Sequence, residues 1–531
     1  MNFHFSVSTI LATSFSVVII AFILRIRNKK LANDDKNRKP PPQAKGAWPI
    51  IGHLHLLGAS QLPHKVLGDM AEEHGPIFTI KLGSHQALVV SNVELARDCL
   101  ATNDKAFASR PRAQAFELMA YNYAVVGFTP YGDYWRQIRK VIVLEMLSQR
   151  RVEMLGNIRV SELRASIRSL YDAWLKNNKS GNSDMVKVDM SHWFGELVLN
   201  VLVRIISGKR FAANDEEATR FQVVIRRYFE LLGAFVVSDF VPYLKPLDLG
   251  GYTKAMKATA NELDNIIEGW FEEKKAQRES AVPHEGNQVL MDVLISTLEG
   301  ASDKEFPGFD HDTIVKATCH QLLTAGLDTT SATLTWALTL LLNNPRALEL
   351  AQAEIDEHVG RDRLVEESDV KNLVYLEAII KETLRLYPAA PLDVPHESIE
   401  DCVVGGYHIT KGTRLLVNLS KIHRDPNNWS NPNEFQPERF LTSQKHIDVK
   451  GNHFELIPFS SGRRMCPGYY LALQELRITL ASLIQQYTLK KPSNKQIDMT
   501  ESAGITIDKK TPLEVLLAPR LSLHLYDDAG K

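Results

Sequence analysis

Cysteine is scarce in this chain of 531 residues, which contains Cys99, Cys319, Cys402 and Cys466. These cysteines are widely spaced and form no paired motif, which argues against a disulfide framework and against a zinc site. The chain also lacks an excess of one charge sign. Its formal net charge is −1, so nothing favours nucleic acid as a partner. No central stretch is rich in Pro, Gly or Ser, and no internal repeat is found, so we expect one large, mainly helical domain in a reducing compartment.

An apolar segment lies near the N-terminus. Phe5–Leu24 carries no charged residue, and about 20 residues at a rise of about 1.5 Å span roughly the hydrocarbon thickness of a bilayer. Basic residues fill Arg25–Lys30 but are missing from Met1–His4, which predicts a single-pass anchor with the rest of the chain in the cytosol. The competing interpretation is a cleaved signal peptide, which would need a basic start, a shorter apolar core and a small-residue cleavage site.

We therefore divide the chain into three parts: an anchor over residues 1–30, a basic, proline-rich hinge over residues 31–52, and a folded domain over residues 53–531. The hinge contains Pro40-Pro41-Pro42, and consecutive prolines are stiff, extended and unable to continue a helix. Such a hinge would set how the folded domain stands off the membrane.

Two short runs early in the folded domain have the character of β-strands. Ile77–Leu82 and Ala87–Val90 flank Gly83-Ser84-His85, which predicts a β-hairpin. Ser91–Glu94 then has the pattern of a capping box, so we expect a helix to begin there.

The segment Phe459–Gly468 surrounds Cys466 with Gly, Arg and Pro, and a helix-patterned stretch follows it over Tyr469–Gln486. A cysteine thiolate is an axial ligand of haem iron, and it pushes electron density onto the metal, which favours O–O cleavage. Nearby arginines and a helix N-terminus would keep the thiol deprotonated. Gly462 permits a tight turn, and Gly468 permits a close approach to a flat ligand. The stretch therefore predicts a socket for a haem iron.

Two further side chains of this segment suit a haem. Arg464 offers a guanidinium to an anionic propionate, and Phe459 would screen the sulfur from water. The order Phe-x-x-Gly-x-Arg-x-Cys-x-Gly resembles the haem-binding signature of the cytochrome P450 monooxygenases. For an isolated cysteine the simpler interpretation is a small buried hydrophobe, and we expect that of the other three cysteines.

A second motif, Trp135-Arg136-Gln137-Ile138-Arg139, supports the same resemblance. Residues four apart share a helix face, so Trp135 and Arg139 would both reach one haem propionate. The Trp-x-x-x-Arg spacing is similar to that of the family. The alternative is a half-buried tryptophan beside a surface arginine.

A helix-patterned stretch from Asp312 to Asn344 carries Ala325-Gly326-Leu327-Asp328-Thr329-Thr330 at its centre. Glycine inside a helix costs about 1 kcal/mol relative to alanine, and such local weakness is expected at functional sites. The motif resembles the family's oxygen-activation sequence. The resemblance implies a gap for dioxygen beside the small residues, a hydrogen bond from Thr329 to the bound oxygen, and proton relay by Asp328. A threonine-rich core helix is the alternative.

A third group of residues resembles the family's Glu–Arg–Arg cluster, which has a structural role. Glu382 and Arg385 are three residues apart on a helix, and Arg439 would join them from a downstream segment. A plain ion pair within the helix is the alternative. The resemblance also gives His396 a contact with a propionate.

The resemblance covers essentially the whole chain after the anchor. The sequence between the motifs is similar to that of the plant microsomal P450s that act on specialised metabolites. It implies a P450 fold, haem b, O2 consumption, and electrons from NADPH-cytochrome P450 reductase. It also implies an endoplasmic-reticulum membrane location with the catalytic domain on the cytosolic face. We expect the reductase to dock at Arg136, Lys140 and Arg463, which offer positive charge to an acidic partner.

The expected reaction is hydroxylation or oxidative demethylation of an apolar flavonoid, terpenoid, furanocoumarin or alkaloid. Two alternatives stay open: a reductase-independent enzyme that rearranges hydroperoxides, and a non-catalytic, membrane-anchored haem protein. The candidate pocket residues are mostly apolar and include no cation: Phe116, Leu118, Gln321, Leu322, Ala325, Leu392, Val394 and Ile505.

Overall fold

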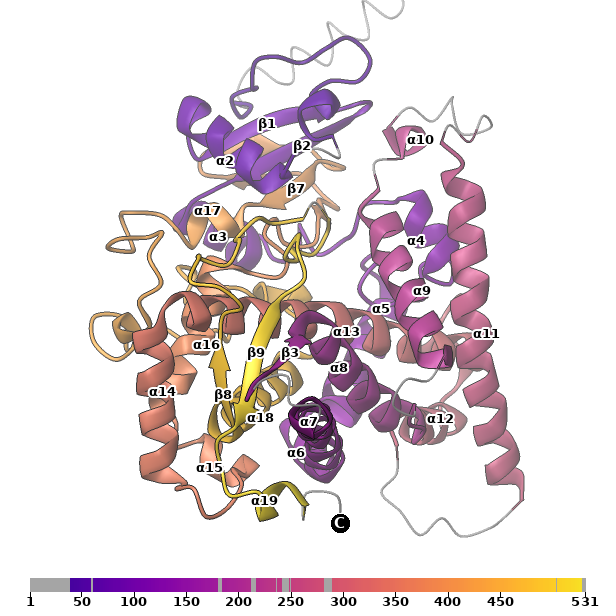
Figure 1. Cartoon of the computed structure of the whole chain (residues 1–531). Helices are drawn as coiled ribbons and strands as arrows, with labels where there is room; N and C mark the ends of the chain where they lie inside the picture. Colours follow the sequence, from indigo (N-terminus) through magenta and orange to yellow (C-terminus); the bar gives the residue numbers. More distant parts are fainter. Residues whose placement is uncertain are drawn as a thin grey trace, which may run out of the picture.

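A computed structural model describes most of the chain after the hinge begins. The described residues are 39–58, 61–179, 184–211, 216–234, 236–240, 248, 250–280, 289–502 and 504–527. Helices dominate, and three small sheets are found within these ranges, which confirms the predicted mainly helical fold (Figure 1). The predicted anchor, Phe5–Leu24, lies outside them. In the part of the chain that is described, no helix is both long enough and apolar enough to cross a bilayer.

A four-stranded sheet occupies one end of the molecule, at the top of Figure 1. Its order is β1-β2-β7-β4, with β2 and β7 parallel and the other neighbours antiparallel. Alternate side chains enter two separate apolar clusters, one on each face, as the two-residue period of a strand requires. The strands are β1 (Ile77–Leu82), β2 (His85–Val90), β4 (His396–Glu397) and β7 (Arg414–Val417).

The predicted hairpin is therefore present, with the first strand as expected and the second beginning two residues earlier. The helix after it, α3 (Val93–Arg97), begins one residue later than the capping-box pattern predicted. Its N-cap is Asn92, whose side-chain oxygen accepts a hydrogen bond from the Leu95 N–H at 3.0 Å. Either side chain can fill this position, and the structure uses the asparagine.

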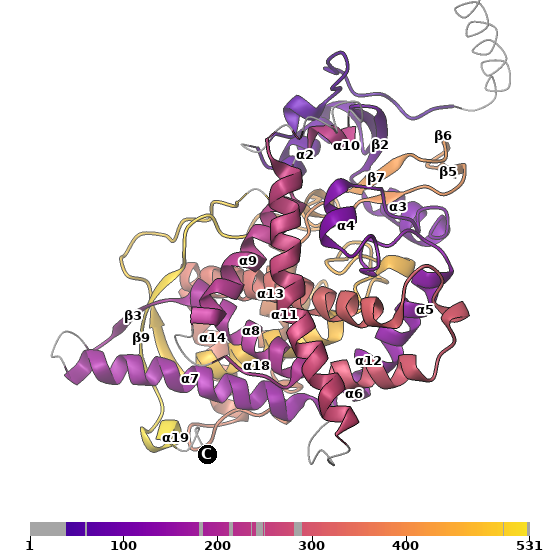
Figure 2. The same ribbon diagram turned by 90° about the vertical axis from the view of Figure 1, so that its right-hand side faces the viewer.

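The longest helix in the described residues, α13 (His311–Asn343), runs through the helical part of the molecule (Figure 2). Its first turn is capped by Asp310, which accepts from the Thr313 N–H at 2.8 Å, and Pro345 follows soon after its end. Several threonines on the helix donate to the carbonyl four residues earlier, as the half-buried Thr329 does to Ala325 at 2.7 Å and the buried Thr339 does to Thr335 at 2.7 Å. Their hydroxyls are thereby satisfied inside the helix.

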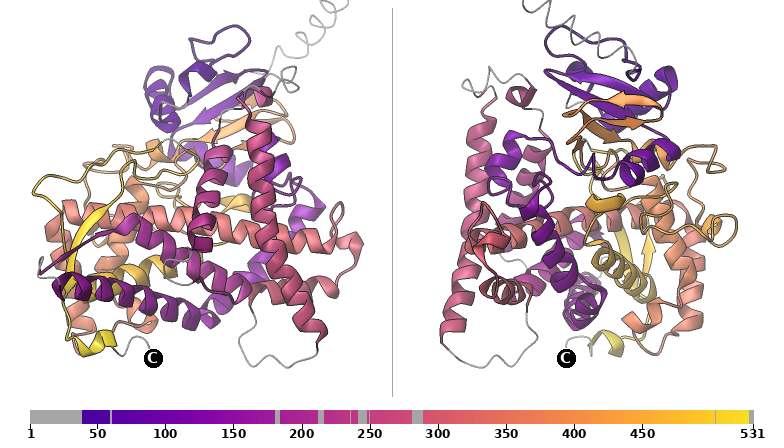
Figure 3. Two further views of the ribbon diagram at one scale, coloured as in Figure 1. Left: turned by 45° about the vertical axis from the view of Figure 1, so that its right-hand side comes forward. Right: turned by 180° about the vertical axis from the view of Figure 1, so that it is seen from behind.

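Helices surround α13 on several sides, and α8 is its main neighbour. Figures 1 and 3 show α9 and α11 on one side of the molecule, and α14, β8 and β9 on the other. The larger helices are α2 (Pro63–His74), α5 (Asp133–Val141), α7 (Gly156–Lys179), α8 (Met190–Ser207), α9 (Glu216–Leu232), α11 (Tyr252–Glu279), α12 (Leu290–Glu299), α14 (Pro345–His358), α16 (Val374–Leu386) and α18 (Tyr469–Gln486).

The remaining elements connect and brace these helices. A second sheet has the order β3-β9-β8, and a third pairs β5 with β6. Their strands are β3 (Val186–Asp189), β5 (Cys402–Val404), β6 (Tyr407–Ile409), β8 (Tyr487–Lys490) and β9 (Glu514–Pro519). The short helices are η1 (Leu54–Leu56), η2 (Asp98–Thr102), α4 (Gln114–Met119), η3 (Ile142–Met146), α6 (Gln149–Met154), α10 (Val237–Phe240), η5 (Asp303–Glu305), α15 (Glu367–Val370), α17 (Leu419–Ile422), η6 (Pro437–Phe440), η7 (Gly462–Arg464) and α19 (His524–Asp527).

Candidate active site

A cavity of about 310 Å³ lies between α13 and the segment around Cys466. Its wall is mostly apolar, and the side chains come from α5, α8, α9, α13 and the start of α18. Cys466 and Thr329, predicted from two distant motifs, line the same cavity. The fold thus joins a thiol and a mid-helix hydroxyl around one enclosed apolar space.

The loop that carries Cys466 is held in shape by its backbone. The Cys466 N–H donates to the Phe459 carbonyl at 2.9 Å. Gly462 has a φ of +67°, and a Cβ there would lie 2.3 Å from the Leu100 carbonyl oxygen, so only glycine fits. Gly468 is less restricted than Gly462, because a Cβ on it would lie 3.9 Å from the Cys466 sulfur, which is an ordinary contact distance. Gly468 also lines the cavity.

The ionisation of Cys466 departs from the expectation of a thiol kept deprotonated by the protein. Burial raises the pKa of the Cys466 thiol, and the N–H groups of Gly468 and Tyr469, together with Arg139, only partly oppose that effect. The loss of hydration outweighs the favourable dipoles and charge. Bound metal would deprotonate such a thiol directly, so the site is better suited to a metal-bound sulfur than to a free thiolate.

Arg464 and the two residues of the Trp-x-x-x-Arg motif also line the cavity. The Arg464 guanidinium lies over the Trp135 ring, and its N–H groups donate to the carbonyls of Ala108 at 2.5 Å and Thr129 at 2.6 Å. Arg139 donates to the Met465 carbonyl. The three predicted residues are therefore brought together beside the cysteine loop.

Arg110 is a further cation of the cavity wall that the sequence analysis missed. It donates to the Gly127 carbonyl at 3.1 Å and to the Pro395 carbonyl at 3.0 Å. Its signal was weak, because Arg-Pro alone indicates only a break in regular structure. Burial lowers the pKa of Arg110 to about 10.

Arg110, Arg139 and Arg464 place three guanidinium groups around one largely buried space. The pKa of Arg464 is lowered to about 8. Burial is the largest cause, and repulsion from the neighbouring Arg110 and Arg139 adds to it. Mutual repulsion of this kind indicates a site short of negative charge. A haem brings two carboxylates, so this set of donors, with the Cys466 sulfur, fits the haem that the resemblance implies.

His396 lies near this cluster but is not among the residues that line the cavity. Its ring is held by the Phe107 carbonyl at 2.8 Å and by Asp393 at 3.4 Å. Asp393, a second residue that the sequence analysis missed, does line the cavity, and Ser460 donates to it at 2.6 Å. The contact predicted for His396 with a propionate is therefore replaced, in the protein alone, by a contact with a carboxylate of the wall.

The centre of α13 presents Ala325 and Thr329 to the cavity. Gly326 also lines the cavity, as expected of the small residues, and a Cβ on it would lie 3.0 Å from the Leu202 side chain of α8. Leu202 therefore fills the notch left by the glycine. Asp328 is half-buried and does not line the cavity, and burial of its carboxyl group raises the pKa of Asp328 to about 6.

Glu382, Arg385 and Arg439 form the expected cluster, at a distance from the cavity wall. Glu382 accepts from Arg385 at 2.7 and 2.8 Å and from Arg439 at 3.1 Å. All three side chains are at most 5 % exposed. The arginines also donate to backbone carbonyls, among them those of His423 and Ser430. The network is well satisfied, as buried charges must be.

The predicted pocket residues divide into two groups. Gln321, Leu322, Ala325, Val394 and Ile505 line the cavity. The other three do not: Phe116 is stacked 4.1 Å from Phe128, Leu118 packs against the main core, and Leu392 packs against the sheet. Many wall residues were missed, and a large group of them lies on α8, α9 and the loop before α5: Val126, Phe128, Val198, Val201, Leu202, Ile205, Ile206, Tyr228, Phe229 and Leu232.

Comparisons with known proteins agree with the site. The family model for cytochrome P450 matches residues 40–515. Strychnine-10-hydroxylase of Strychnos nux-vomica is 50% identical over 96% of this chain and 97% of its own length. Demethylepipodophyllotoxin synthase of Sinopodophyllum hexandrum is 51% identical over 91% and 93%, and flavonoid-6-hydroxylase of Mentha piperita is 49% identical over 99% and 100%. A zebra fish cytochrome P450 solved with progesterone has a TM-score of 0.71 at 26% identity, covering 87% of this chain and 100% of that one.

Proposed function

The chain belongs to the cytochrome P450 family and is a haem-thiolate monooxygenase, and from that premise we propose that it oxidises an apolar, polycyclic plant metabolite with electrons supplied from NADPH by a flavin-containing reductase. The observation that carries the proposal is the enclosed, mostly apolar cavity shared by Cys466 and Thr329. Apolar walls bind apolar substrates by removing their surface from water.

Haem bound at Cys466 supplies the activation of O2 that a side chain cannot provide. The residues of this chain bind and orient it. Arg110, Arg139 and Arg464 supply N–H donors and positive charge for its carboxylates, and the loop of Cys466 supplies the sulfur. Leu202 and the other apolar residues of the wall keep water from the reacting centre.

Thr329 follows Asp328 directly in α13 and lines the cavity with its hydroxyl group. Because it donates to the Ala325 carbonyl at 2.7 Å, its oxygen is held in place with lone pairs left to accept a proton-bearing partner. Asp328, which precedes it and does not line the cavity, has a carboxyl pKa raised by burial to about 6, so the group can exchange protons near neutral pH. The pair would deliver protons while the apolar wall keeps bulk water away.

Three relatives of known name act on an alkaloid, a lignan and a flavonoid skeleton, all of them polycyclic. That range supports the substrate class without choosing within it. Gln321 is one of the polar groups of this mostly apolar wall, and its side-chain oxygen already accepts a hydrogen bond from the Gly127 N–H at 3.2 Å. The proposed substrate is therefore a flat molecule with few polar groups.

The proposed setting is the endoplasmic-reticulum membrane. The apolar run Phe5–Leu24 with the basic run after it supports a single-pass anchor, and it leaves the catalytic domain on the cytosolic face. A membrane-bound reductase would then meet the enzyme in the same plane.

The experiment that tests the proposal uses microsomes containing the full chain, beside a Cys466→Ala control. A reduced carbon-monoxide difference spectrum comes first, because the band of thiolate-ligated haem must be present and must be lost in the control. Type I spectral shifts with a panel of an alkaloid, a flavone, a furanocoumarin and a lignan then select ligands. Product carrying ¹⁸O from ¹⁸O2, dependent on NADPH and added reductase, is the expected result. Product formed from a hydroperoxide without reductase would overturn it.

A further inference from the structure

One polar side chain of α13 lines the cavity two turns before Thr329. Gln321, Ala325 and Thr329 are spaced four residues apart and all line the cavity, so they form a row along one face of the helix. At a rise of about 1.5 Å per residue, Gln321 lies about 12 Å from Thr329 along the helix axis. The small side chain of Ala325 leaves room for a flat molecule between them. An elongated substrate can therefore touch Thr329 at one end and Gln321 at the other.

The amide group of Gln321 is held in one orientation. Its Oε1 atom accepts a hydrogen bond from the Gly127 N–H at 3.2 Å. A backbone N–H can only donate, so the amide oxygen faces Gly127 and the amide nitrogen is left for another partner. A Cβ on Gly127 would lie 2.6 Å from this oxygen, so a side chain at position 127 would push the amide out of place.

The Nε2 group of Gln321 is an unused donor. It has no hydrogen-bond partner in the described part of the chain, and it is not among the enclosed, unpartnered polar atoms of the core. Gln321 is half-buried and lines the cavity, so these N–H groups open on the space that a substrate would fill. In a mostly apolar cavity, such a donor favours a ligand that supplies an acceptor.

Three hydroxyl groups of the same wall are already used as donors. Thr324 donates to the His320 carbonyl at 2.8 Å, Thr329 to Ala325 at 2.7 Å, and Thr333 to Thr329 at 2.8 Å. Their protons remain within α13, so they do not compete with the Gln321 amide for an acceptor on the substrate.

The backbone beside Gln321 also holds the cations of the cofactor site. The Gly127 carbonyl accepts from the Arg110 Nε at 3.1 Å, and the Val126 carbonyl accepts from the Arg464 side chain at 3.2 Å. One short segment thus fixes the amide of Gln321 relative to the guanidinium groups that would orient the cofactor. A substrate bound to this amide would have a defined position relative to the site of oxidation.

We propose that Gln321 is a specificity-determining residue, which donates a hydrogen bond from Nε2 to a carbonyl oxygen at one end of the substrate while the carbon to be oxidised lies near Thr329 at the other end. The substrate class is thereby narrowed from apolar polycyclic molecules to elongated ones with a terminal acceptor. The inference rests on the monooxygenase activity proposed above, but the binding that it describes requires only the haem-loaded protein.

The test measures spectral dissociation constants of the full-length holoenzyme for 2-acetylphenanthrene and 2-ethylphenanthrene, flat probes that differ in one terminal oxygen. The quantity compared is the ratio of the two constants, in which general effects on pocket volume largely cancel. Gln321→Met removes the amide and keeps the length of the side chain. The ratio should then shift against the acetyl probe by about fivefold, the net effect of one neutral hydrogen bond. Gln352→Met, which alters a half-buried glutamine of α14 that does not line the cavity, should leave it unchanged.

A second variant separates donation to the ligand from support of the backbone. Gln321→Glu keeps an acceptor for the Gly127 N–H but has no donor once ionised, so it is measured at about pH 8.5, far above the ordinary Glu pKa of about 4.3. It should lose the preference as Gln321→Met does. A normal ratio in Gln321→Glu with an altered one in Gln321→Met would show a purely structural role and overturn the inference. An unchanged ratio in both variants, or a wild type without a spectral shift for the acetyl probe, would also overturn it.

The position of oxidation gives a further readout. Wild type should oxidise 2-acetylphenanthrene mainly on the ring remote from the acetyl group, and Gln321→Met should yield a broader set of positions. The products from 2-ethylphenanthrene should change little between the two enzymes. Identical products from the acetyl probe in both enzymes would contradict the inference. A wild type with the expected spectra but no NADPH-dependent product would instead count against the proposed function and leave the binding result standing.

Discussion

The guanidinium of Arg464 lies 4.3 Å from the centroid of the Trp135 ring. The same guanidinium donates to the carbonyls of Ala108 and Thr129, so one side chain joins the cysteine loop, α5 and the loop before α5. Cation–π contact and carbonyl bonds together hold a charge that burial disfavours. The positive charge is therefore in position before any cofactor binds.

Thr329→Val should separate O2 consumption from product formation. The change removes the hydroxyl at the cavity wall and its bond to the Ala325 carbonyl but keeps the shape of the side chain. Loss of a group that assists proton transfer lowers the rate of a step by about 10²-fold or more. The reduced carbon-monoxide spectrum should persist while most NADPH is diverted to peroxide. Thr339→Val, which is buried on the same helix but does not line the cavity, is the control.

Glu382→Ala should abolish haem incorporation. The substitution leaves Arg385 and Arg439 buried without their carboxylate, and breaking a buried ion network costs about 3–5 kcal/mol. Loss of the carbon-monoxide band and a lower melting temperature are expected. The matched control is Glu377→Ala, which removes the half-exposed partner of Arg477 and should cost far less. Equal losses in the two variants would contradict the special role of the buried cluster.

Gly462→Ala should displace the cysteine loop. Alanine at a φ of +67° is strained by about 1–3 kcal/mol, and its Cβ would meet the Leu100 carbonyl oxygen. The thiolate-ligated band should weaken or shift toward that of a protein without the sulfur ligand. Gly132→Ala is the control, because its backbone is extended and nothing lies within 4 Å of the added carbon. A normal spectrum in Gly462→Ala would show that the loop tolerates a different path.

Stability should fall in mild acid because of His423. The pKa of His423 is lowered to about 3, mainly by burial and secondly by the charge of Arg385. The Nε2 atom of His423 accepts a hydrogen bond from the Ile457 N–H at 3.1 Å. Since the folded-state pKa lies below the unfolded value, this stability is present above about pH 6.5 and is lost as pH falls toward 3. His423→Gln should flatten the fall of the free energy of unfolding by up to about 1.4 kcal/mol per pH unit. Exposed His524→Gln should leave the slope unchanged.

Neutralising Arg136, Lys140 and Arg463 should raise the Michaelis constant for reductase without altering the haem spectrum. Arg136 and Arg463 are ion-paired with Asp133 and Asp104, so their share of the effect should be smaller than sequence alone suggests. Higher ionic strength should weaken the same interaction.

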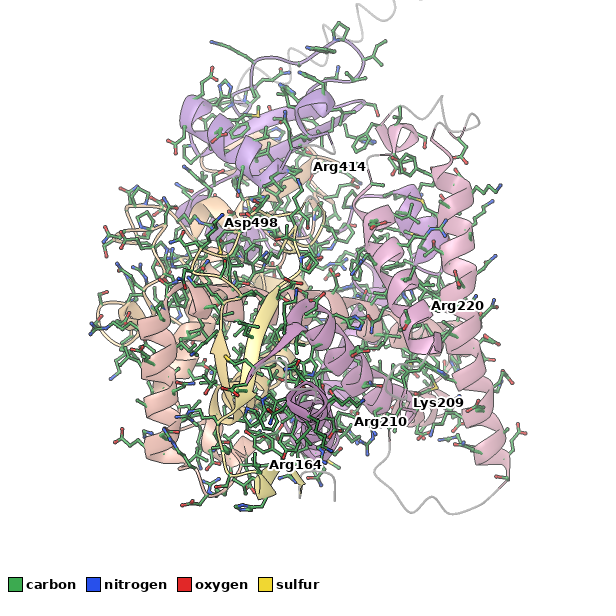
Figure 4. The ribbon with its side chains drawn as sticks, in the orientation of Figure 1. Arg164, Lys209, Arg210, Arg220, Arg414 and Asp498 are labelled. Atoms are coloured by element: carbon green, nitrogen blue, oxygen red, sulfur yellow. The ribbon has the colours of Figure 1, made fainter. Side chains whose placement is uncertain are left out.

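The control for the reductase experiment is the double variant Lys209→Gln and Arg220→Gln, whose cations are labelled in Figure 4 and pair with Glu273 and Glu262 of α11. An unchanged Michaelis constant in the triple variant would remove these residues from the docking face. A change equal to that of the control would point to a general effect of net charge.

Local signals in the sequence predicted a large part of the fold. α18 spans the predicted Tyr469–Gln486, α13 begins and ends one residue earlier than predicted, and β1 spans Ile77–Leu82. The sequences of these elements have a regular spacing of apolar residues or recognisable start and stop residues. Both signals depend on residues close together in the chain, so they can be recognised without knowing the fold. The cap of α3 shifted by one residue because Ser91 and Asn92 are both good caps.

Long-range packing was harder to predict. The face of α8 that lines the cavity repeats at helical spacing, but a period does not say which partner that face will meet. Phe116 and Leu392 are apolar, as a pocket residue should be, yet Phe116 is buried in the main core and Leu392 packs, partly buried, against the cluster on the sheet. Arg110 escaped notice because its function depends on two other arginines, which are distant in sequence and meet it only in the folded chain.

Leu202 of α8 fills the notch at Gly326, one turn of α13 before Thr330. Leu202 is also part of the wall that a substrate touches. Leu202 is thus a wall residue in direct contact with the helix that carries Thr329, so under the proposed function a change at this position should affect both substrate fit and oxygen handling. Attempts to broaden the range of accepted molecules by changing α8 should therefore alter the yield of product per electron as well. Laboratory evolution of this scaffold would do best to change first the parts of the wall formed by α9 and by Ile505 and Thr506.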